Sequence, residues 1–315
     1  MKRFLLTTAL GLAFTGAQAA QVTFYQLPQN AFPHDVAPGA NGIVWYSGQQ
    51  LGVLGRFDPA TGTAEHIPLG RSSAPHGIIV APDGAVWLND GGQNALVRFE
   101  PSTRAMKVFP LPSNFPHANL NTAVVDKTGV VWFTGQSGVY GRVDPVSGKV
   151  DAWAAPRGFG PYGITMTPSG EIWYASLAGD HIAHIDRSTG IATVVEPPRK
   201  GVGPRRIWSD SKGMLWSSFW NAGGVGRYDP DKKTWTHYPM PRSRSGTYAV
   251  YVDDKDRVWA TDWQANALQR FDPVSERYET FPSDHRGANV RQLLGRPGET
   301  WGGESGTDRL VVVRD

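Results

Sequence analysis

The chain has 315 residues, with 31 Lys and Arg against 28 Asp and Glu, a formal net charge of +3 and no Cys. The absence of Cys excludes disulfides, thiol catalysis and thiolate metal sites. The small net charge gives no reason to expect a nucleic-acid partner.

Residues 1–20 have the pattern of a secretory signal peptide. A basic start, KR, and a short apolar run, FLLTTALGLAF, precede an A-x-A cleavage pattern at the end of this segment. The run is too short to span a bilayer, so we expect export to the periplasm or the medium and no membrane insertion. Without this segment, 29 basic residues face 28 acidic ones.

A repeated phrase runs along the rest of the chain. APHGIIVAPDGAVW, at residues 74–87, has six altered counterparts, and each one ends on a Trp. Successive members of this series lie 41 to 45 residues apart, which is the length of one propeller blade. The series consists of Trp45, Trp87, Trp132, Trp173, Trp216, Trp259 and Trp301. We expect each of these rings to fill the gap between successive blades.

Each repeat contains signals for four short strands. In the second repeat, HGIIVAP, AVWLND, ALVRFEP and AMKVFPLP are separated by turn segments such as PDG and PSTR. Short segments rich in Val, Ile, Phe and Trp and bounded by Gly, Pro and Asp indicate strands. The pattern predicts an all-β protein, a seven-bladed β-propeller of four-stranded antiparallel blades.

The first and last segments predict how the ring closes. The last repeat has signals for three strands, QLLG, TWGG and DRLVVV. The segment VTFYQLP, at residues 22–28, matches the fourth-strand pattern of other repeats, such as VFPLP. We therefore expect the N-terminal strand to complete the last blade and hide both sheet edges. Residues 21–315 would then form a single propeller domain.

The first strand of each blade lines the central channel, and its opening residue lies at one mouth. Around the ring this position holds His34, His76, Asn121, Tyr162, Arg205, Tyr248 and either Val290 or Arg291. A purely structural position would keep one residue type, so this polar variety favours a ligand site. The candidate catalytic residues are His34 and His76. The candidate ligand contacts are Asn121, Tyr162, Arg205, Tyr248, Trp263 and Arg291. Alternatively, these groups only hydrate the channel and cap strand ends.

A second set of positions lies three residues after each repeating Trp. Carboxylates occupy this position only in blades two, six and seven, as Asp90, Asp262 and Glu304. The loop that leaves the second strand should emerge at the same mouth, so these three residues are candidate metal ligands. Each carboxylate could instead accept hydrogen bonds from the backbone of its own loop.

Basic residues are frequent in the segments that lead into blades five to seven. They are Arg199, Lys200, Arg205, Arg206, Arg242, Arg244, Arg286 and Arg291. If they converge at the mouth, they favour a ligand with an anionic group. The alternative is scattered surface charge.

The chain resembles the streptogramin lyase family (the virginiamycin B lyases) over its whole mature length. The resemblance lies in PHGIIVAPDGAVW, in GRFDPATG with a following IPLG, and in WATDWQANALQRFDP. It implies a seven-bladed propeller that opens a cyclic depsipeptide by elimination. A His base would remove a proton, the ester C–O bond would break, and Mg²⁺ would stabilise the negative charge. Mg²⁺ is thus a cofactor implied by the resemblance alone.

The chain departs from the family at the residues that carry this chemistry. Where the family has its two histidines, in P-H-A-I and E-P-H phrases, this chain has Tyr248 and Val290 or Arg291. In blades one and two it has P-H pairs that end at His34 and His76, with no Glu before either Pro. A rotated site would need Asp35 or Asp90 in place of the missing Glu. We therefore expect virginiamycin-type depsipeptides to be poor substrates.

Three functions remain open from the sequence. The first is a C–O lyase acting on a cyclic or ester-bearing compound, and the second is a non-catalytic binding propeller. The third is a metal-dependent lactonase, which the seven repeats disfavour because such enzymes usually have six blades. We expect a monomer with a small-molecule or peptide ligand. A carboxylate within reach of His34 or His76 would favour the first function.

Overall fold

The computed structural model describes residues 20–241 and 246–315. The signal-peptide pattern, apart from its last residue, lies outside the described residues, and so do Arg242 and Arg244. In the described ranges, no helix has the length and apolar character needed to cross a membrane.

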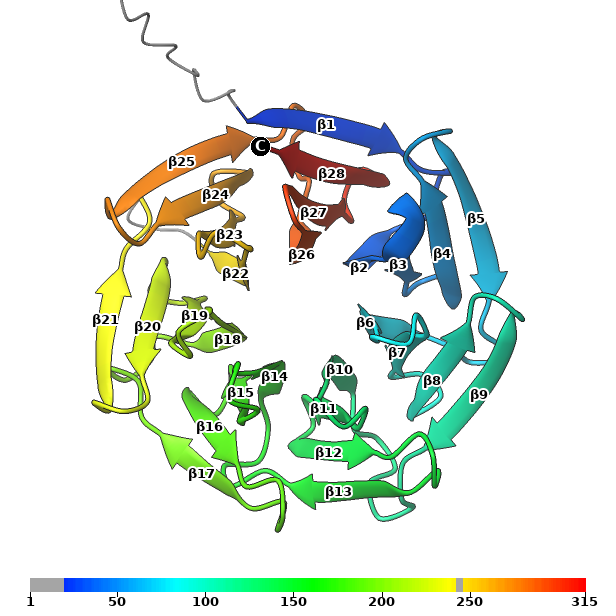
Figure 1. The fold of residues 1–315 in the computed structure, drawn as a ribbon, viewed down its shortest axis with the longest axis horizontal. Helices are drawn as coiled ribbons and strands as arrows, with labels where there is room; N and C mark the ends of the chain where they lie inside the picture. The colour runs from blue at the N-terminus through cyan, green and yellow to red at the C-terminus, as the bar shows by residue number, and fades with distance from the viewer. Residues whose placement is uncertain (1–19, 242–245) are drawn as a thin grey trace, which may run out of the picture.

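Seven four-stranded antiparallel sheets surround a central axis (Figure 1). Blade 1 contains β2 (Pro33–Pro38), β3 (Val44–Gly48), β4 (Val53–Asp58) and β5 (Thr63–Pro68), with the 3-10 turn η1 (Ala40–Gly42) between β2 and β3. Blade 2 contains β6 (Pro75–Val80), β7 (Val86–Asp90), β8 (Ala95–Glu100) and β9 (Ala105–Pro110). Blade 3 contains β10 (Leu120–Val125), β11 (Val131–Gly135), β12 (Val139–Val143) and β13 (Val150–Ala154). Blade 4 contains β14 (Pro161–Met166), β15 (Ile172–Ser176), β16 (His181–Ile185) and β17 (Ala192–Val195).

The remaining blades follow the same plan. Blade 5 contains β18 (Pro204–Ser209), β19 (Leu215–Phe219), β20 (Val225–Asp229) and β21 (Thr234–Tyr238). Blade 6 contains β22 (Thr247–Val252), β23 (Val258–Asp262), β24 (Ala267–Asp272) and β25 (Arg277–Pro282). Blade 7 contains β26 (Val290–Arg296), β27 (Glu299–Glu304), β28 (Arg309–Arg314) and, from the other end of the chain, β1 (Gln21–Gln26). The predicted seven-bladed propeller is confirmed.

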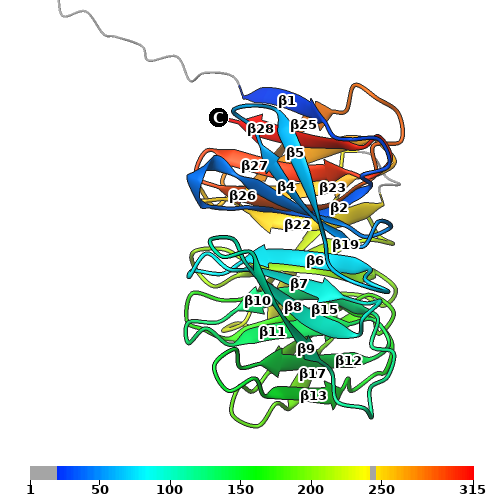
Figure 2. The same cartoon turned by 90° about the vertical axis from the view of Figure 1, so that its right-hand side faces the viewer.

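The N-terminal strand closes the ring. β1 pairs with β28 in antiparallel register, from Gln21 opposite Arg314 to Gln26 opposite Arg309. Figure 1 shows β1 at the rim, outside β28 and next to the C-terminus. Figure 2 shows the ring edge-on, with the loops at two opposite faces. The prediction that the first segment completes the last blade is confirmed.

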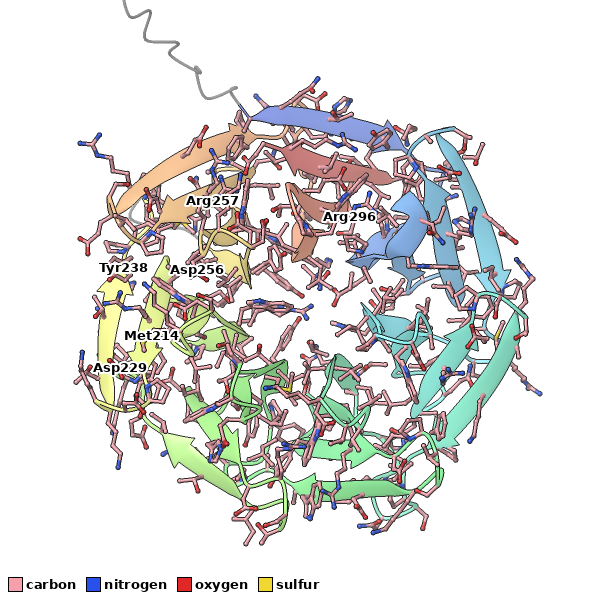
Figure 3. All side chains as sticks on the ribbon, viewed as in Figure 1. Met214, Asp229, Tyr238, Asp256, Arg257 and Arg296 are labelled. Atoms are coloured by element: carbon pink, nitrogen blue, oxygen red, sulfur yellow. The ribbon has the colours of Figure 1, made fainter. Side chains whose placement is uncertain are left out.

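Packing between blades explains the repeating Trp. All seven members of the series are buried, with at most 7% of their surface exposed. Trp87 of blade 2, for example, belongs to the same apolar cluster as Leu120 and Phe133 of blade 3. Side chains occupy much of the space between the ribbons (Figure 3). Burying a ring of this size at every interface is a major part of what holds the blades together.

Turn carboxylates fix several of these rings. The indole Nε1 of Trp132 donates to Asp126 over 3.0 Å, and the indole Nε1 of Trp216 donates to Asp210 in the same way. Asp126 also accepts from the backbone N–H of Thr128, within the hairpin turn. One carboxylate therefore closes the turn and orients the buried ring.

Candidate functional site

A β-bulge in the first strand of every blade builds the channel mouth. In blade 1, Pro33 pairs with Gly48 and Val36 with Tyr46, so β2 has one residue more than the segment of β3 that it faces. The same irregularity occurs in β6, β10, β14, β18, β22 and β26. A bulge turns the side chains of neighbouring residues away from strict alternation. Two successive residues per blade can therefore contribute to the channel.

The first bulge residues meet at the mouth, as the sequence predicts. The His34 and His76 rings lie 3.9 Å apart between centroids. Asn121 Nδ2 lies 3.3 Å from His76 Nε2, and the His76 ring contacts Tyr162 edge-on. In blade 7 the contributing residue is Arg291, whereas Val290 is paired in the strand ladder. The uncertainty between these two residues is thus resolved in favour of Arg291.

Blades 4 to 6 contribute an aromatic and cationic cluster. The hydroxyl groups of Tyr162 and Tyr248 are hydrogen-bonded to each other. The guanidinium of Arg205 lies 3.5 Å above the Tyr248 ring and donates to the Tyr162 hydroxyl over 2.9 Å. Trp263 stacks on Tyr248 with 5.0 Å between the ring centroids. Since both tyrosines are buried, the half-buried Trp263 provides the flat surface at the rim.

The second bulge residues form a polar layer beneath the mouth. Arg206 of blade 5 reaches across the channel and places Nη2 3.0 Å from both carboxylate oxygens of Asp35 in blade 1. Its other amino group donates to Thr122 in blade 3 over 2.6 Å. The corresponding residue of blade 4 is Gly163, where a Cβ would lie 2.6 Å from the Arg206 Cα. Only glycine allows this close approach of the two strands.

The Asp35 carboxylate orients the mouth histidine. His34 Nδ1 lies 2.8 Å from Asp35 Oδ1. Although burial opposes ionisation, Arg206 and His34 hold the pKa of Asp35 well below its usual range, so the carboxylate is ionised and can only accept. His34 therefore carries its proton on Nδ1, which leaves Nε2 as the proton acceptor.

Burial keeps both histidines neutral. It lowers the pKa of His34, and the contact with Asp35 offsets this effect only in part. Burial and the neighbouring His34 lower the pKa of His76 well below its ordinary value. The two groups thus remain unprotonated at neutral pH, as a general base must be.

The tyrosines respond differently to their surroundings. Burial and the neighbouring Tyr248 raise the pKa of Tyr162 to about 12. Burial also opposes ionisation of Tyr248, but Arg205 and Arg206 outweigh it and bring the pKa of Tyr248 below its ordinary value. The positive charge of the two arginines therefore acts directly on the aromatic cluster.

A pocket opens beside His34, between blades 1 and 7. Its volume is about 250 Å³, and its lining includes Phe32, His34, Gln50, Arg291 and Ser305. Arg291 Nε donates to the Ser305 hydroxyl over 3.1 Å, which holds the guanidinium at the pocket wall. His76 does not line this pocket. Among the two candidate catalytic histidines, His34 is the one that a ligand in the pocket would meet.

The three candidate metal-ligating carboxylates are not brought together. Asp90 accepts from the Ser73 hydroxyl and from the backbone N–H groups of Ala74, Gly92 and Gln93. Asp262 accepts from the backbone of Ala265. These contacts match the alternative interpretation, in which each carboxylate holds its own loop.

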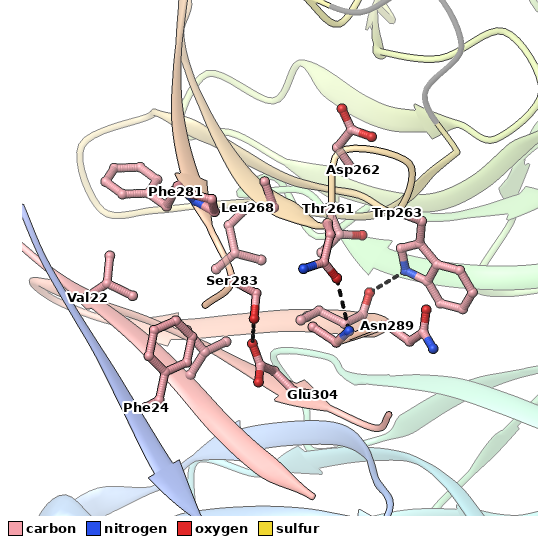
Figure 4. Close-up of a pocket in the computed structure, with 16 residues that line it drawn as sticks. Val22, Phe24, Thr261, Asp262, Trp263, Leu268, Phe281, Ser283, Asn289 and Glu304 are labelled. Atoms are coloured by element: carbon pink, nitrogen blue, oxygen red, sulfur yellow. Dashed lines mark hydrogen bonds between the residues drawn. The ribbon is translucent and has the colours of Figure 1, made fainter. Parts of the chain in front are cut away.

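Glu304 belongs to a separate pocket between blades 6 and 7. It accepts from the Ser283 hydroxyl (Figure 4). It also accepts from Thr307 and pairs with Arg309. Asp262 lines the same pocket, but no shared cation site between these two carboxylates is found among the described residues. The expectation of a metal site built by Asp90, Asp262 and Glu304 therefore has no geometric support.

The basic residues converge only in part. Arg205, Arg206 and Arg291 meet at the mouth, whereas Arg199, Lys200 and Arg286 are exposed. The convergence comes from the bulges of β18 and β26, and the loop residues before these strands do not share in it.

The residues present do not fit the Mg²⁺ ion that the resemblance implies. Among described residues, one group of His, Asp and Glu has ligand atoms close enough to share a cation, within 4.8 Å: His34, Asp35 and His76. Mg²⁺ prefers oxygen ligands and carboxylates that balance its charge. Here two donors are nitrogens, and Arg206 already neutralises the only carboxylate. The buried His76 Nδ1 has no hydrogen-bond partner, but one free nitrogen does not supply the missing negative charge.

The layer of Asp35 and Arg206 is the part of the site that the repeat pattern does not reveal. With regular strand alternation, equivalent positions of the repeats predict one mouth residue per blade. The signal that could have revealed the second position is the occurrence of charged residues directly after His34 and Arg205, inside strands that are otherwise apolar.

Known proteins that resemble this chain share its propeller fold. The family described as virginiamycin B lyase matches residues 70–315. No curated protein matches the chain. Virginiamycin B lyase from Staphylococcus aureus has a similar structure, with a TM-score of 0.86 at 19% identity over 94% of this chain and 100% of that one.

Two further structures carry ligands. A catalytically inactive variant of the Staphylococcus aureus lyase with quinupristin has a TM-score of 0.87 at 19% identity, covering 94% of this chain and 100% of that one. YCF48 bound to D1 peptide has a TM-score of 0.75 at 16% identity, covering 93% and 97%. At these identities the structural similarity establishes the fold.

Proposed function

The chain belongs to the virginiamycin B lyase family, and from this premise we propose that it binds a small-molecule or peptide ligand at the mouth of its channel. An anionic group on the ligand is favoured, because Arg205 and Arg291 are both at the mouth. The observation that carries the proposal is the pocket of about 250 Å³ between blades 1 and 7, lined by His34 and Arg291.

The setting of the pocket supports ligand binding. Two side chains that line the pocket are held by hydrogen bonds: His34 is bonded to Asp35, and Arg291 is bonded to Ser305. Preorganised polar groups lose little conformational entropy when a ligand arrives. Related propellers are found with quinupristin and with a peptide, which fits a scaffold that accepts ligands of either class.

The cellular location of the protein is part of the same proposal. The signal-peptide pattern of residues 1–20 supports export, so the protein would work in the periplasm or outside the cell. We expect it to act there as a monomer. The near balance of charge in the mature chain supports a ligand other than nucleic acid.

A second candidate function is C–O elimination, and the hydrogen bond from His34 to Asp35 favours it. In such a reaction His34 Nε2 would take the proton from the carbon next to a carbonyl, a carbon–carbon double bond would form, and the C–O bond at the neighbouring carbon would break. The oxygen would leave as a carboxylate, and His34 would release its proton to water. No family histidine is carried over to this position, so elimination ranks below binding.

Pocket-filling variants test the binding proposal. Small molecules and peptides that bind the wild type, measured by calorimetry, should bind Gln50→Trp at least about tenfold more weakly, because the new ring occupies the pocket. Gln264→Trp, an exposed position outside the pocket, serves as the control. Ligands that bind both variants equally well would contradict a site at the mouth.

The same protein separates binding from elimination. Incubation with quinupristin should give little or no ring opening. Ring opening is measured by chromatography and fragment masses, because elimination leaves the total mass unchanged, whereas hydrolysis adds one water. Rapid ring opening that disappears in His34→Ala would instead establish the second candidate function.

A further inference from the structure

Two arginines at the mouth have no acidic partner. Among the described residues, neither Arg205 nor Arg291 forms an ion pair, whereas Arg206 beside them is paired with Asp35. The undescribed segments, residues 1–19 and 242–245, contain no Asp or Glu, so they hold no carboxylate that could fill this role. The mouth therefore carries two positive charges that no carboxylate of this chain neutralises through an ion pair.

Both guanidinium groups lie near the ring of Tyr248. Arg205 lies 3.5 Å and Arg291 5.9 Å from the centroid of the Tyr248 ring. Arg291 also lies 5.1 Å from the ring of Trp263, whose indole nitrogen donates to the Val290 carbonyl over 2.7 Å. Cation–π contacts hold the two charges in place without neutralising them.

Donor groups remain available on both side chains. One amino group of Arg205 donates to Tyr162, and Nε of Arg291 donates to Ser305. No described residue bonds to the other amino group of Arg205 or to the two amino groups of Arg291. An oxyanion that reaches both side chains would accept these free N–H groups and offset the unpaired positive charge.

From this arrangement, which rests on the proposed function, we infer that Arg205 and Arg291 form an oxyanion subsite. The group bound there is a carboxylate or a phosphate, attached to a flat part of the ligand that lies against Trp263. In the pocket beside it, His34 meets the remainder of the ligand. A ligand of this class needs no Mg²⁺, because the protein supplies the positive charge itself.

Three probes of the same shape test the inference. Benzoate and phenyl phosphate carry an oxyanion on a flat ring, and benzamide is the neutral counterpart of benzoate. Calorimetric titration of the full protein in EDTA should show binding of at least one anion, at least about tenfold tighter than benzamide. The stronger of the two anions identifies the oxyanion class. Equal binding of benzamide, or no binding of either anion, overturns the inference.

Variants place the binding at the two arginines. Arg291→Gln should weaken the anion by about tenfold or more, and Arg291→Lys should recover part of the loss because it restores the charge. Arg286→Gln, which removes an exposed arginine outside the pocket, should leave the affinity unchanged. Equal affinity of wild type and Arg291→Gln overturns the inference.

The metal ion gives the last arm of the test. Titration with Mg²⁺ alone should give no binding heat, and added Mg²⁺ should not tighten the anion. A requirement for Mg²⁺ overturns the inference. If anion binding requires Mg²⁺ but Gln50→Trp still weakens the binding of another ligand, the proposed function stands and only the oxyanion subsite is wrong.

Discussion

At the scale of single residues, the mouth depends on a chain of contacts from Arg206 through Asp35 to His34. Arg206 keeps Asp35 ionised, and Asp35 fixes the proton of His34 on Nδ1. Burying an ionised carboxylate without a partner costs free energy, so Asp35 can be ionised at this position only because Arg206 reaches it from the far side of the channel. His76 packs against His34 and does not line the pocket, which gives the two histidines different roles.

The buried histidines predict how stability changes with pH. Their pKa values are lowered in the native state, so below about pH 6.5 the unfolded chain binds protons that the native protein does not. The free energy of unfolding should therefore fall as the pH is lowered from 7 to 5, by up to about 1.4 kcal/mol per pH unit for each histidine. Urea unfolding at a series of pH values measures this slope.

A matched pair of variants assigns the slope to the mouth. His76→Gln removes one titrating group while keeping an acceptor for Asn121, and should flatten the pH dependence. His117→Gln, at an exposed position, should leave it as in the wild type. A slope unaffected by His76→Gln would mean that this histidine is not held neutral by burial.

At the scale of elements, the sequence predicts the strands but does not predict the bulges. Short apolar segments between Gly, Pro and Asp turns are sufficient to predict four strands per repeat, and the spacing of Trp predicts seven blades. A bulge adds one residue to a strand without changing its composition, so hydrophobic pattern alone does not reveal it. For this reason the position of His34 was predictable, whereas the layer of Asp35 and Arg206 required the register of β2 and β18.

The carboxylates after the repeating Trp show the same limit. Asp90 and Glu304 stand at equivalent positions of the repeat, yet their partners differ. Asp90 accepts from backbone N–H groups of two loops, and Glu304 accepts from side chains, including Arg309. Position in a repeat tells which face a residue is on, and it does not tell which donors are nearby. Backbone N–H groups satisfy Asp90, whereas hydroxyl groups and a guanidinium satisfy Glu304.

Ring closure by β1 gives a prediction at this scale. Removing residues 21–28 should lower the free energy of unfolding by at least about 3 kcal/mol, because Phe24 and Leu27 leave apolar clusters and β28 loses its ladder partner. Urea unfolding checks this, with a chain that begins at Ala20 as the control. An unchanged unfolding midpoint would show that β1 is dispensable for the ring.

At the scale of the whole molecule, a symmetric ring holds an asymmetric site. The seven blades repeat the same strands and the same buried Trp, while the mouth differs from blade to blade. The contact of Arg206 with Asp35 joins blades 5 and 1, and the contact between Tyr162 and Tyr248 joins blades 4 and 6. The first link crosses the channel beneath the mouth and the second crosses it at the mouth, so the open space for a ligand is the pocket between blades 1 and 7.

The most direct test of this account is a crystal structure of the protein grown with Mg²⁺ and soaked with the stronger binder of benzoate and phenyl phosphate. The account predicts this anion at the mouth, with its oxyanion at Arg205 and Arg291 and its ring against Trp263, and Arg206 still paired with Asp35. Mg²⁺ bound to Asp35, with Arg206 displaced from the carboxylate, would contradict it, and so would the anion bound only away from the two arginines.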